Sequence, residues 1–107
     1  MTFYEAVISM EDGYVVLDFA SGIGHPTSVW AFAREVEAYE KQASPDWSFD
    51  EYTDTRVTGA ALALAIRKIR PKVSKGIGDV VLEDSDPVRF ADSLDENGTY
   101  VVMWGDY

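Results

Sequence analysis

The strongest constraint on the fold is the alternation of apolar and polar residues on both sides of Asp12-Gly13. Asp-Gly is a typical two-residue hairpin loop because both residues tolerate positive φ angles, and the alternation is typical of strands with one buried face. With Asp12-Gly13 as the loop, the predicted pairs are Met10 with Val15, Ile8 with Leu17 and Ala6 with Phe19. All of these side chains share one face, whereas the face with Glu5 and Asp18 is mixed and expected to be partly wet.

Two longer helices are expected in the middle of the chain. The first covers about residues 27–43, where apolar residues recur at the spacing of one helix face. The second covers about residues 56–70 and is stopped by Pro71, because a proline cannot continue a helix. This second helix is apolar nearly all round over residues 57–66, so we expect it to be the more deeply buried of the two.

The last third of the chain predicts two further strands around a short helix. A strand is expected at residues 79–83, and Asp86 caps a short helix that has Pro87 at its first position. Residues 99–104 form an unbroken apolar run that suits an interior strand. The order is ββααβαβ, so we predict one α+β domain over residues 1–107, with about four mainly antiparallel strands in one sheet and helices mostly on one face.

Composition limits the class of protein. A content of 47% hydrophobic and 13% aromatic residues excludes a disordered acidic tail, because such tails lack the apolar area that offsets chain entropy. The absence of cysteine excludes disulfides and a thiolate zinc site, and it fits a reducing compartment. The first ten residues have no basic region of a signal peptide, and the longest apolar run, 59–66, is far shorter than the roughly 20 residues of a membrane span. We therefore expect a cytoplasmic protein with no membrane partner.

Charge is divided unevenly along the chain. Residues 55–78 hold six of the nine bases and no acidic residue, whereas all 19 carboxylates lie elsewhere with the other three bases. That segment therefore carries about +6 and the remainder about −16, which gives the net charge of −10. Net charge bears on solubility and partners rather than on fold. This balance predicts a partner whose own surface is basic.

The densest group of bases, here called the basic stripe, covers residues 67–75. Cations near the C-terminus of a helix favour its macrodipole, so one interpretation of the stripe is structural. The others are a contact with acidic surface, either within the chain or across a homodimer, and a strip that binds a ligand or nucleic acid. We expect no direct binding of nucleic acid, because the stripe lacks interleaved aromatics and the acidic remainder repels phosphates.

No pattern in the chain indicates catalysis. Gly22-Ile23-Gly24 stands where a phosphate could bind, but the third glycine of a dinucleotide fingerprint and the Lys-Ser/Thr of a P-loop are missing. His25 is the single histidine; it precedes a proline and has no nucleophile elbow beside it. The acids of Asp84-Ser85-Asp86 do not follow the ligand spacing of a calcium loop. We therefore expect no enzyme activity, no cofactor and no metal.

The segment Ser44–Asp54 is the most specific candidate for a partner-binding surface. It combines three aromatic rings with carboxylates, and aromatic rings concentrate binding energy while carboxylates steer a basic partner. The alternative is that the rings fold back as a lid on the core. A second candidate anchor is Trp30, which falls off the apolar stripe of the first helix. The predicted partner-binding residues are Asp46, Trp47, Asp50, Glu51, Tyr52, Asp54, Trp30 and Glu37.

These features favour a non-enzymatic acidic protein that binds and inhibits a basic protein, such as a nuclease or another nucleic-acid-binding complex. Two kinds of protein with this character stay open: nucleic-acid mimics of the anti-CRISPR or anti-restriction type, and immunity proteins against nuclease toxins. Two other classes also stay open. One is a structural or regulatory interaction module whose acidity serves solubility, and the other is a small-ligand-binding or enzymatic domain that uses the His25 loop.

Overall fold

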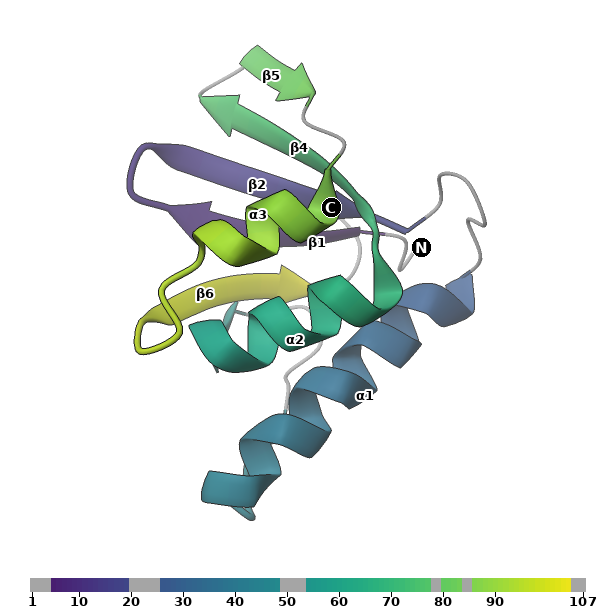
Figure 1. Cartoon of the computed structure of the whole chain (residues 1–107), viewed down its shortest axis with the longest axis vertical. Coiled ribbons are helices and arrows are strands. Elements are labelled where there is room, and N and C mark those ends of the chain that lie inside the picture. The colour runs from purple at the N-terminus through teal and green to yellow at the C-terminus, as the bar shows by residue number, and fades with distance from the viewer. Residues whose placement is uncertain (1–4, 20–25, 49–53, 78–79, 84–85, 105–107) are drawn as a thin grey trace.

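The structure, a computed structural model, describes residues 5–19, 26–48, 54–77, 80–83 and 86–104 (Figure 1). The strands are β1 (Glu5–Met10), β2 (Gly13–Asp18), β3 (Asp54–Thr58), β4 (Lys72–Ile77), β5 (Val80–Glu83) and β6 (Thr99–Trp104). The helices are α1 (Pro26–Ala43), α2 (Gly59–Ile69) and α3 (Pro87–Ser93). The predicted α+β class is confirmed, and the order of the described elements is ββαβαββαβ.

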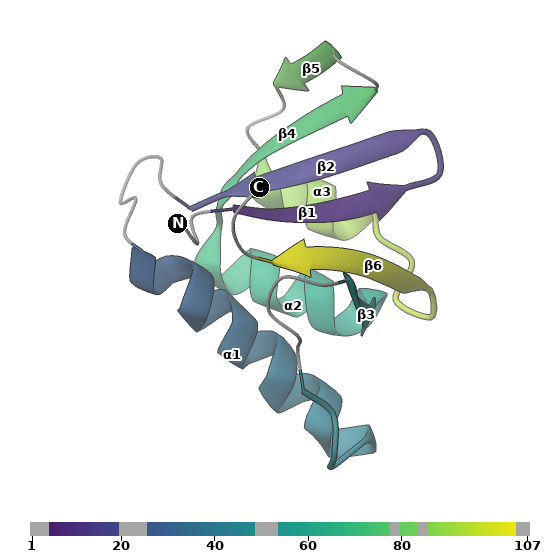
Figure 2. The ribbon, with the colours of Figure 1, turned by 180° about the vertical axis from the view of Figure 1, so that it is seen from behind.

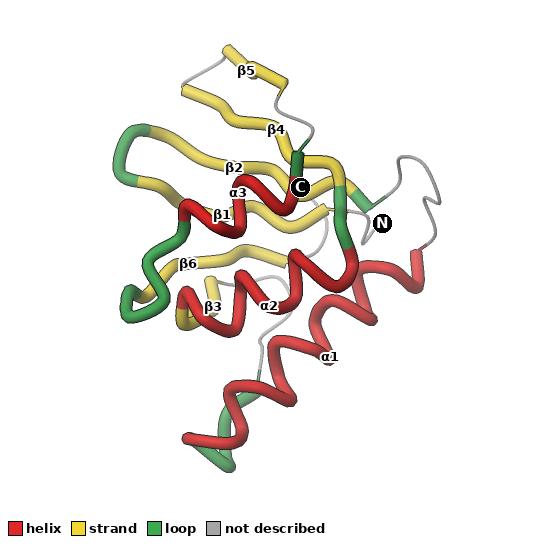
Figure 3. Tube along the Cα trace, in the orientation of Figure 1, coloured by secondary structure: helices red, strands yellow, loops and turns green. Residues whose placement is uncertain are grey.

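The strands form one antiparallel sheet in the order β3-β6-β1-β2-β4-β5. Figure 1 shows α2 and α3 in front of this sheet, and in Figure 2, turned by 180°, they lie behind it. The coloured trace in Figure 3 shows α1 running beside α2, at the β3–β6 end of the sheet. The predicted arrangement, with helices mainly on one face, is confirmed, but the described part of the chain places six strands in the sheet rather than about four. As predicted, β6 is an interior strand, between β3 and β1.

The β1–β2 hairpin closes one residue earlier than predicted. Its loop is Glu11-Asp12, and the observed pairs are Met10 with Gly13, Ile8 with Val15 and Ala6 with Leu17. Side chains keep their predicted faces, because moving the partner by two residues preserves the alternation. Gly13 has a φ of 151°, and a Cβ there would lie 2.1 Å from the carbonyl oxygen of Gly76 on β4. The predicted register is therefore wrong, because Gly13 serves the close approach of two strands rather than the loop.

Two strands were not predicted, and each adjoins α2. β3 takes the end of the expected connector and the start of the expected helix, so α2 begins at Gly59 rather than at about Arg56. β4 begins at Lys72, inside the basic stripe. Between them, Arg70 ends α2 in the left-handed conformation (φ 54°, ψ 60°) and donates its amide to the Ile66 carbonyl at 2.8 Å. This cap reverses the chain directly into β4, which begins two residues later at Lys72.

The core lies between the helix-side face of the sheet and the helices. Phe32 of α1 packs on Phe19, which follows β2, with ring centroids 5.2 Å apart. The largest fully buried side chains are Phe32, Ile8, Leu17, Leu62, Ile66, Val36, Val57, Val73 and Val102. Six residues of α2 are buried, so the prediction that this helix is the deeply buried one is confirmed. Among the described residues, no helix combines the length and apolar character that crossing a membrane requires.

The N-terminus of α2 is held by three separate parts of the chain. The hydroxyl of its cap, Thr58, accepts the amide of Ala61 at 3.3 Å. The amides of Gly59 and Ala60 donate to backbone carbonyls of the turn between α3 and β6. Glu40 of α1, almost fully buried, accepts both the amide and the hydroxyl of Thr58, at 3.3 and 2.6 Å. The first-turn amides of a helix have no partner within the helix, so these contacts join α1, α2 and the α3–β6 turn.

Candidate protein-binding surfaces

The connector between α1 and β3 begins with a turn that places Trp47 against the protein. The amide of Trp47 donates to the carbonyl of Ser44 at 2.8 Å. Its indole Nε1 donates to the carbonyl of Arg56 on β3 at 3.3 Å, and the half-buried ring packs against the core. β3 is an edge strand of the sheet, so Trp47 covers part of an open strand edge. For Trp47 the contacts favour the lid interpretation.

We expect Trp47→Ala to lower the free energy of unfolding by about 1–2 kcal/mol, less than for a fully buried ring because the side chain is only half-buried. Chemical denaturation measures this loss. Trp47→Phe keeps a ring and removes the N–H donor, so its loss should be smaller. Unchanged stability of Trp47→Ala, together with weaker binding to a partner, would contradict the lid interpretation.

Two of the predicted binding carboxylates mark the ends of the connector. Asp46 is exposed in the turn after α1, and Asp54 is exposed at the first residue of β3. Asp54 pairs in register with a residue of β6 and lies on the sheet face away from the helices. Asp50, Glu51 and Tyr52 lie outside the described residues. The structure therefore places only the two ends of this predicted surface.

Trp30 and Glu37 are the predicted binding residues of α1, and Trp30 lies far from the start of the connector. Trp30 is half-buried against the core, and Glu37 forms an ion pair of 3.1 Å with Lys41, one turn further along the helix. With a rise of 1.5 Å per residue, Trp30 is roughly 20 Å from the end of α1 at Ala43. The structure does not bring the two predicted anchors, Trp30 and Trp47, into one patch.

The basic stripe contacts acidic side chains of its own chain. Arg67 Nη2 lies 2.8 Å from Asp92 Oδ1 on α3, and Lys68 Nζ lies 2.8 Å from Glu35 Oε1 on α1. Arg70 Nε donates to the carbonyl of Arg67 at 3.2 Å. Exposed ion pairs of this kind contribute at most about 1 kcal/mol each to stability, but they hold Arg67 and Lys68 next to acidic side chains of the same chain. The contacts favour the interpretation of the stripe as an intramolecular contact, and a homodimer through it stays a prediction.

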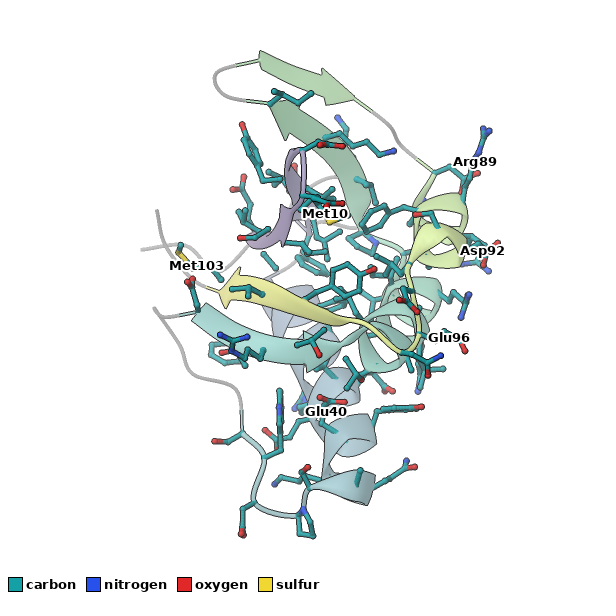
Figure 4. All side chains as sticks on the ribbon, turned by 90° about the vertical axis from the view of Figure 1, so that its left-hand side faces the viewer. Met10, Glu40, Arg89, Asp92, Glu96 and Met103 are labelled. Carbon is teal, nitrogen blue, oxygen red and sulfur yellow. The ribbon has the colours of Figure 1, made fainter. Side chains whose placement is uncertain are left out.

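The sheet face away from the helices carries an apolar strip with a charged end. Val7, Val16 and Met103 are register neighbours, each is half-buried, and Figure 4 shows Met103 on the side opposite the helices. At the end of β1, Glu5 is the register partner of Asp18. Burial raises the pKa of the Glu5 carboxyl above its usual value, and the carboxylate of Asp18 raises it further. The mixed character predicted for this face is confirmed.

Carboxylates gather at the end of the sheet where the β1–β2 hairpin turns. We call this surface the acidic end and define it by Glu11, Asp12, Asp95 and Glu96, all of which are exposed. The first two form the hairpin loop and the last two lie in the turn after α3; both loops appear at the left of Figure 1. Figure 4 views this side of the molecule and shows Glu96 below α3. Sequence reasoning missed this surface because its acids come from two distant segments.

A pocket of about 310 Å³ adjoins the acidic end, between the hairpin, the end of β4 and α3. Its lining includes the buried side chains of Val15 and Phe90 and the exposed side chain of Ile77. The hairpin loop Glu11-Asp12 also lines it, so carboxylates and apolar surface lie side by side. Sequence reasoning did not identify this pocket either.

Comparisons with known proteins give no relative for this chain. No protein-family model matches it, and neither a curated protein nor a solved structure matches. Within the part of the chain that the structure describes, no three His, Cys, Asp or Glu side chains come together in a way that could hold a metal ion. His25 and the Gly22-Ile23-Gly24 segment lie outside the described residues. Surface charge and surface shape are therefore the features that bear on function.

Proposed function

We propose that this chain is a non-enzymatic acidic protein that binds a basic protein partner and blocks its basic surface. The observation that carries the proposal is the charge distribution, with 19 carboxylates against nine bases. Arg67 and Lys68 of the basic stripe are already paired with carboxylates of the same chain, as is Lys41 on α1, so part of the positive charge is engaged internally. The net charge of −10 is then presented to a partner by surfaces such as the acidic end.

The partner that fits this charge is a nucleic-acid-binding protein, for example a nuclease. Such proteins bind the phosphate backbone with grooves or faces of Lys and Arg. Carboxylates held on a folded protein can pair with the same Lys and Arg side chains, and their electrostatic field raises the association rate of the two proteins. The acidic end offers four carboxylates from two loops, and Asp46 and Asp54 offer a second group at the ends of the connector. Nucleic-acid mimics and nuclease-immunity proteins both fall within this proposal.

A first test is the salt dependence of association. The partner is identified by affinity purification with mass spectrometry, and its association rate with the chain is measured by stopped flow at about 50 and 500 mM salt, between which the Debye length falls severalfold. Because exposed charges act mainly on the association rate, we expect it to fall about tenfold or more. An equal rate at both salt concentrations would contradict electrostatic steering.

The inhibitory role is tested separately by competition. A nucleic-acid probe bound to the identified partner should be released when the chain is added, because both compete for the same basic surface. The chain alone should not shift single- or double-stranded probes at low salt. Micromolar binding of a probe by the chain itself, lost on charge reversal at Arg67 and Lys68, would instead assign the basic stripe to nucleic acid.

A further inference from the structure

We propose that the pocket beside the acidic end receives one bulky apolar side chain from a basic segment of the partner. This inference rests on the proposed function and names the part of the surface that gives the contact its specificity. Aromatic and large aliphatic anchors that enter a pocket supply most of the energy at protein interfaces, while surrounding charges set orientation and rate. The pocket and the acidic end together supply both elements.

Exposed apolar surface is the first argument. Ile77 is 63% exposed, and among the residues whose side chains the structure describes only one other large hydrophobic side chain, Leu64 at 44%, is exposed. Ile77 lines the pocket together with Val15 and Phe90, which are 2% and 3% exposed. Exposed apolar surface that continues into a recess is typical of a binding site, whereas a single exposed side chain on a helix is ordinary. Leu64 on α2 is such a side chain and does not line the pocket.

The fold itself creates the recess. α3 is only seven residues long, and Figure 1 shows β4 and β5 extending beyond it. Where the hairpin meets β4, a Cβ on Gly13 would lie 2.1 Å from the carbonyl oxygen of Gly76. Tyr14 is the register partner of Gly76, and its ring lies over that glycine, because a Cβ there would be 2.3 Å from the ring. The pocket is therefore bounded by paired strands and a helix rather than by a loop alone.

The polar groups around the pocket indicate the chemistry of the occupant. The side chains of Glu11 and Asp12 are exposed and make no ion pair within the described residues, whereas Lys75 is the one cation of the lining. The hydroxyl of Ser93 already donates to the carbonyl of Phe90 at 2.6 Å, so it is not available as a donor. An apolar side chain next to Lys or Arg therefore fits the pocket better than a polar or anionic group does.

A second copy of the chain is the main alternative occupant. Each copy carries a net charge of −10, and like charges brought together at an interface oppose association. A dimer through this surface would also place two acidic ends close to one another. The charge complementarity of a basic segment favours the heterologous partner.

The test uses two synthetic peptides of about ten residues, both rich in Lys and Arg, with tryptophan or alanine at the centre. Titration into the ¹⁵N-labelled chain, followed by NMR, gives the affinity and the location of each peptide. We expect the tryptophan peptide to bind about tenfold more tightly, because a ring in a pocket adds to the charge contacts, and to shift signals of Gly13, Ile77 and Phe90. Ile77→Ser should remove the difference between the peptides.

Leu64→Ser, which changes the other exposed apolar side chain, should leave the difference in affinity between the two peptides unchanged. Asp12→Lys, in the exposed hairpin loop, should weaken the binding of both peptides. The tryptophan peptide should still bind more tightly than the alanine peptide. Equal affinity of the two peptides, or shifts confined to the connector, would overturn the pocket inference and leave salt-dependent docking of the acidic surface standing. A dimer in sedimentation that Ile77→Ser dissociates would overturn it in favour of a second copy. The proposed function fails in a different experiment: the association rate with the identified partner would then be the same at low and high salt.

Discussion

Gly59→Ala is expected to lower the free energy of unfolding by about 3 kcal/mol and the melting temperature by about 10–20 °C. A Cβ at this position would lie 1.9 Å from the carbonyl oxygen of Asp95 and 2.8 Å from its carbonyl carbon. These backbone atoms cannot move away freely, because two hydrogen bonds tie the same turn to α2. The amide of Gly59 donates to the Gly98 carbonyl at 2.9 Å, and the amide of Ala60 donates to the Glu96 carbonyl at 3.3 Å. The methyl group must therefore either clash or break these bonds.

The sign of the effect is informative. Replacing glycine by alanine within a helix ordinarily stabilises it by up to about 1 kcal/mol, so a loss must come from the contact with the turn. Gly98→Ala is the matched control, because a Cβ there would meet Asp95 at 3.2 Å or more and needs only a small adjustment. Thermal melts of both variants make the comparison. A melting temperature of Gly59→Ala equal to or above that of the unmodified chain would show that the turn yields without cost.

Elements marked by local chemistry were predictable. The cap of α3 is one example: Asp86 accepts the amide of Arg89 at 3.1 Å and Pro87 follows at the first helical position. β6 begins and ends where its apolar run does, at Thr99 and Trp104. The two faces of the hairpin were also predicted correctly, because their alternation belongs to the residues themselves and does not depend on register.

β3 and β4 were not predictable in the same way. Asp54–Thr58 alternates polar and apolar residues, but it is short and runs without a turn residue into α2, so the sequence is equally consistent with a helix that starts at about Arg56. In Lys72–Ile77 the same alternation is obscured by cations that suggest a charged surface. Short strands gain their stability from neighbouring strands, here β6 and β2, and those neighbours are distant in sequence.

The candidate surfaces show the same division between local and tertiary information. The net charge and the aromatic connector were visible in the sequence, but whether Trp47 faces a partner depends on the carbonyl of Arg56, nine residues away on a strand that was not predicted. The pocket needs Val15, Ile77 and Phe90, which only the sheet and α3 bring together. One signal was present in the sequence: Ile77 is a large apolar residue flanked by two glycines.

Glu40→Ala is expected to lower the free energy of unfolding by about 3 kcal/mol, although the residue is a carboxylate in a strongly acidic protein. The side chain is only 8% exposed and accepts the hydroxyl of Thr58 at 2.6 Å and its amide at 3.3 Å. Removing it leaves two partly buried donors of Thr58 without this acceptor and takes a negative charge from the N-terminus of α2, where the helix dipole favours one. The loss should appear in urea denaturation with an unchanged m-value.

Two variants separate these causes. Glu40→Gln retains one amide oxygen as acceptor but no charge, so it should recover part of the stability and no more. Glu37→Ala, on the same helix, removes a carboxylate whose side chain is 31% exposed and which forms a 3.1 Å ion pair with Lys41, so it should cost less than about 0.5 kcal/mol. If Glu40→Ala lowered the free energy of unfolding no more than Glu37→Ala does, the hydrogen bonds to Thr58 would contribute nothing net to stability. The junction of α1 with α2 would then depend on apolar packing alone.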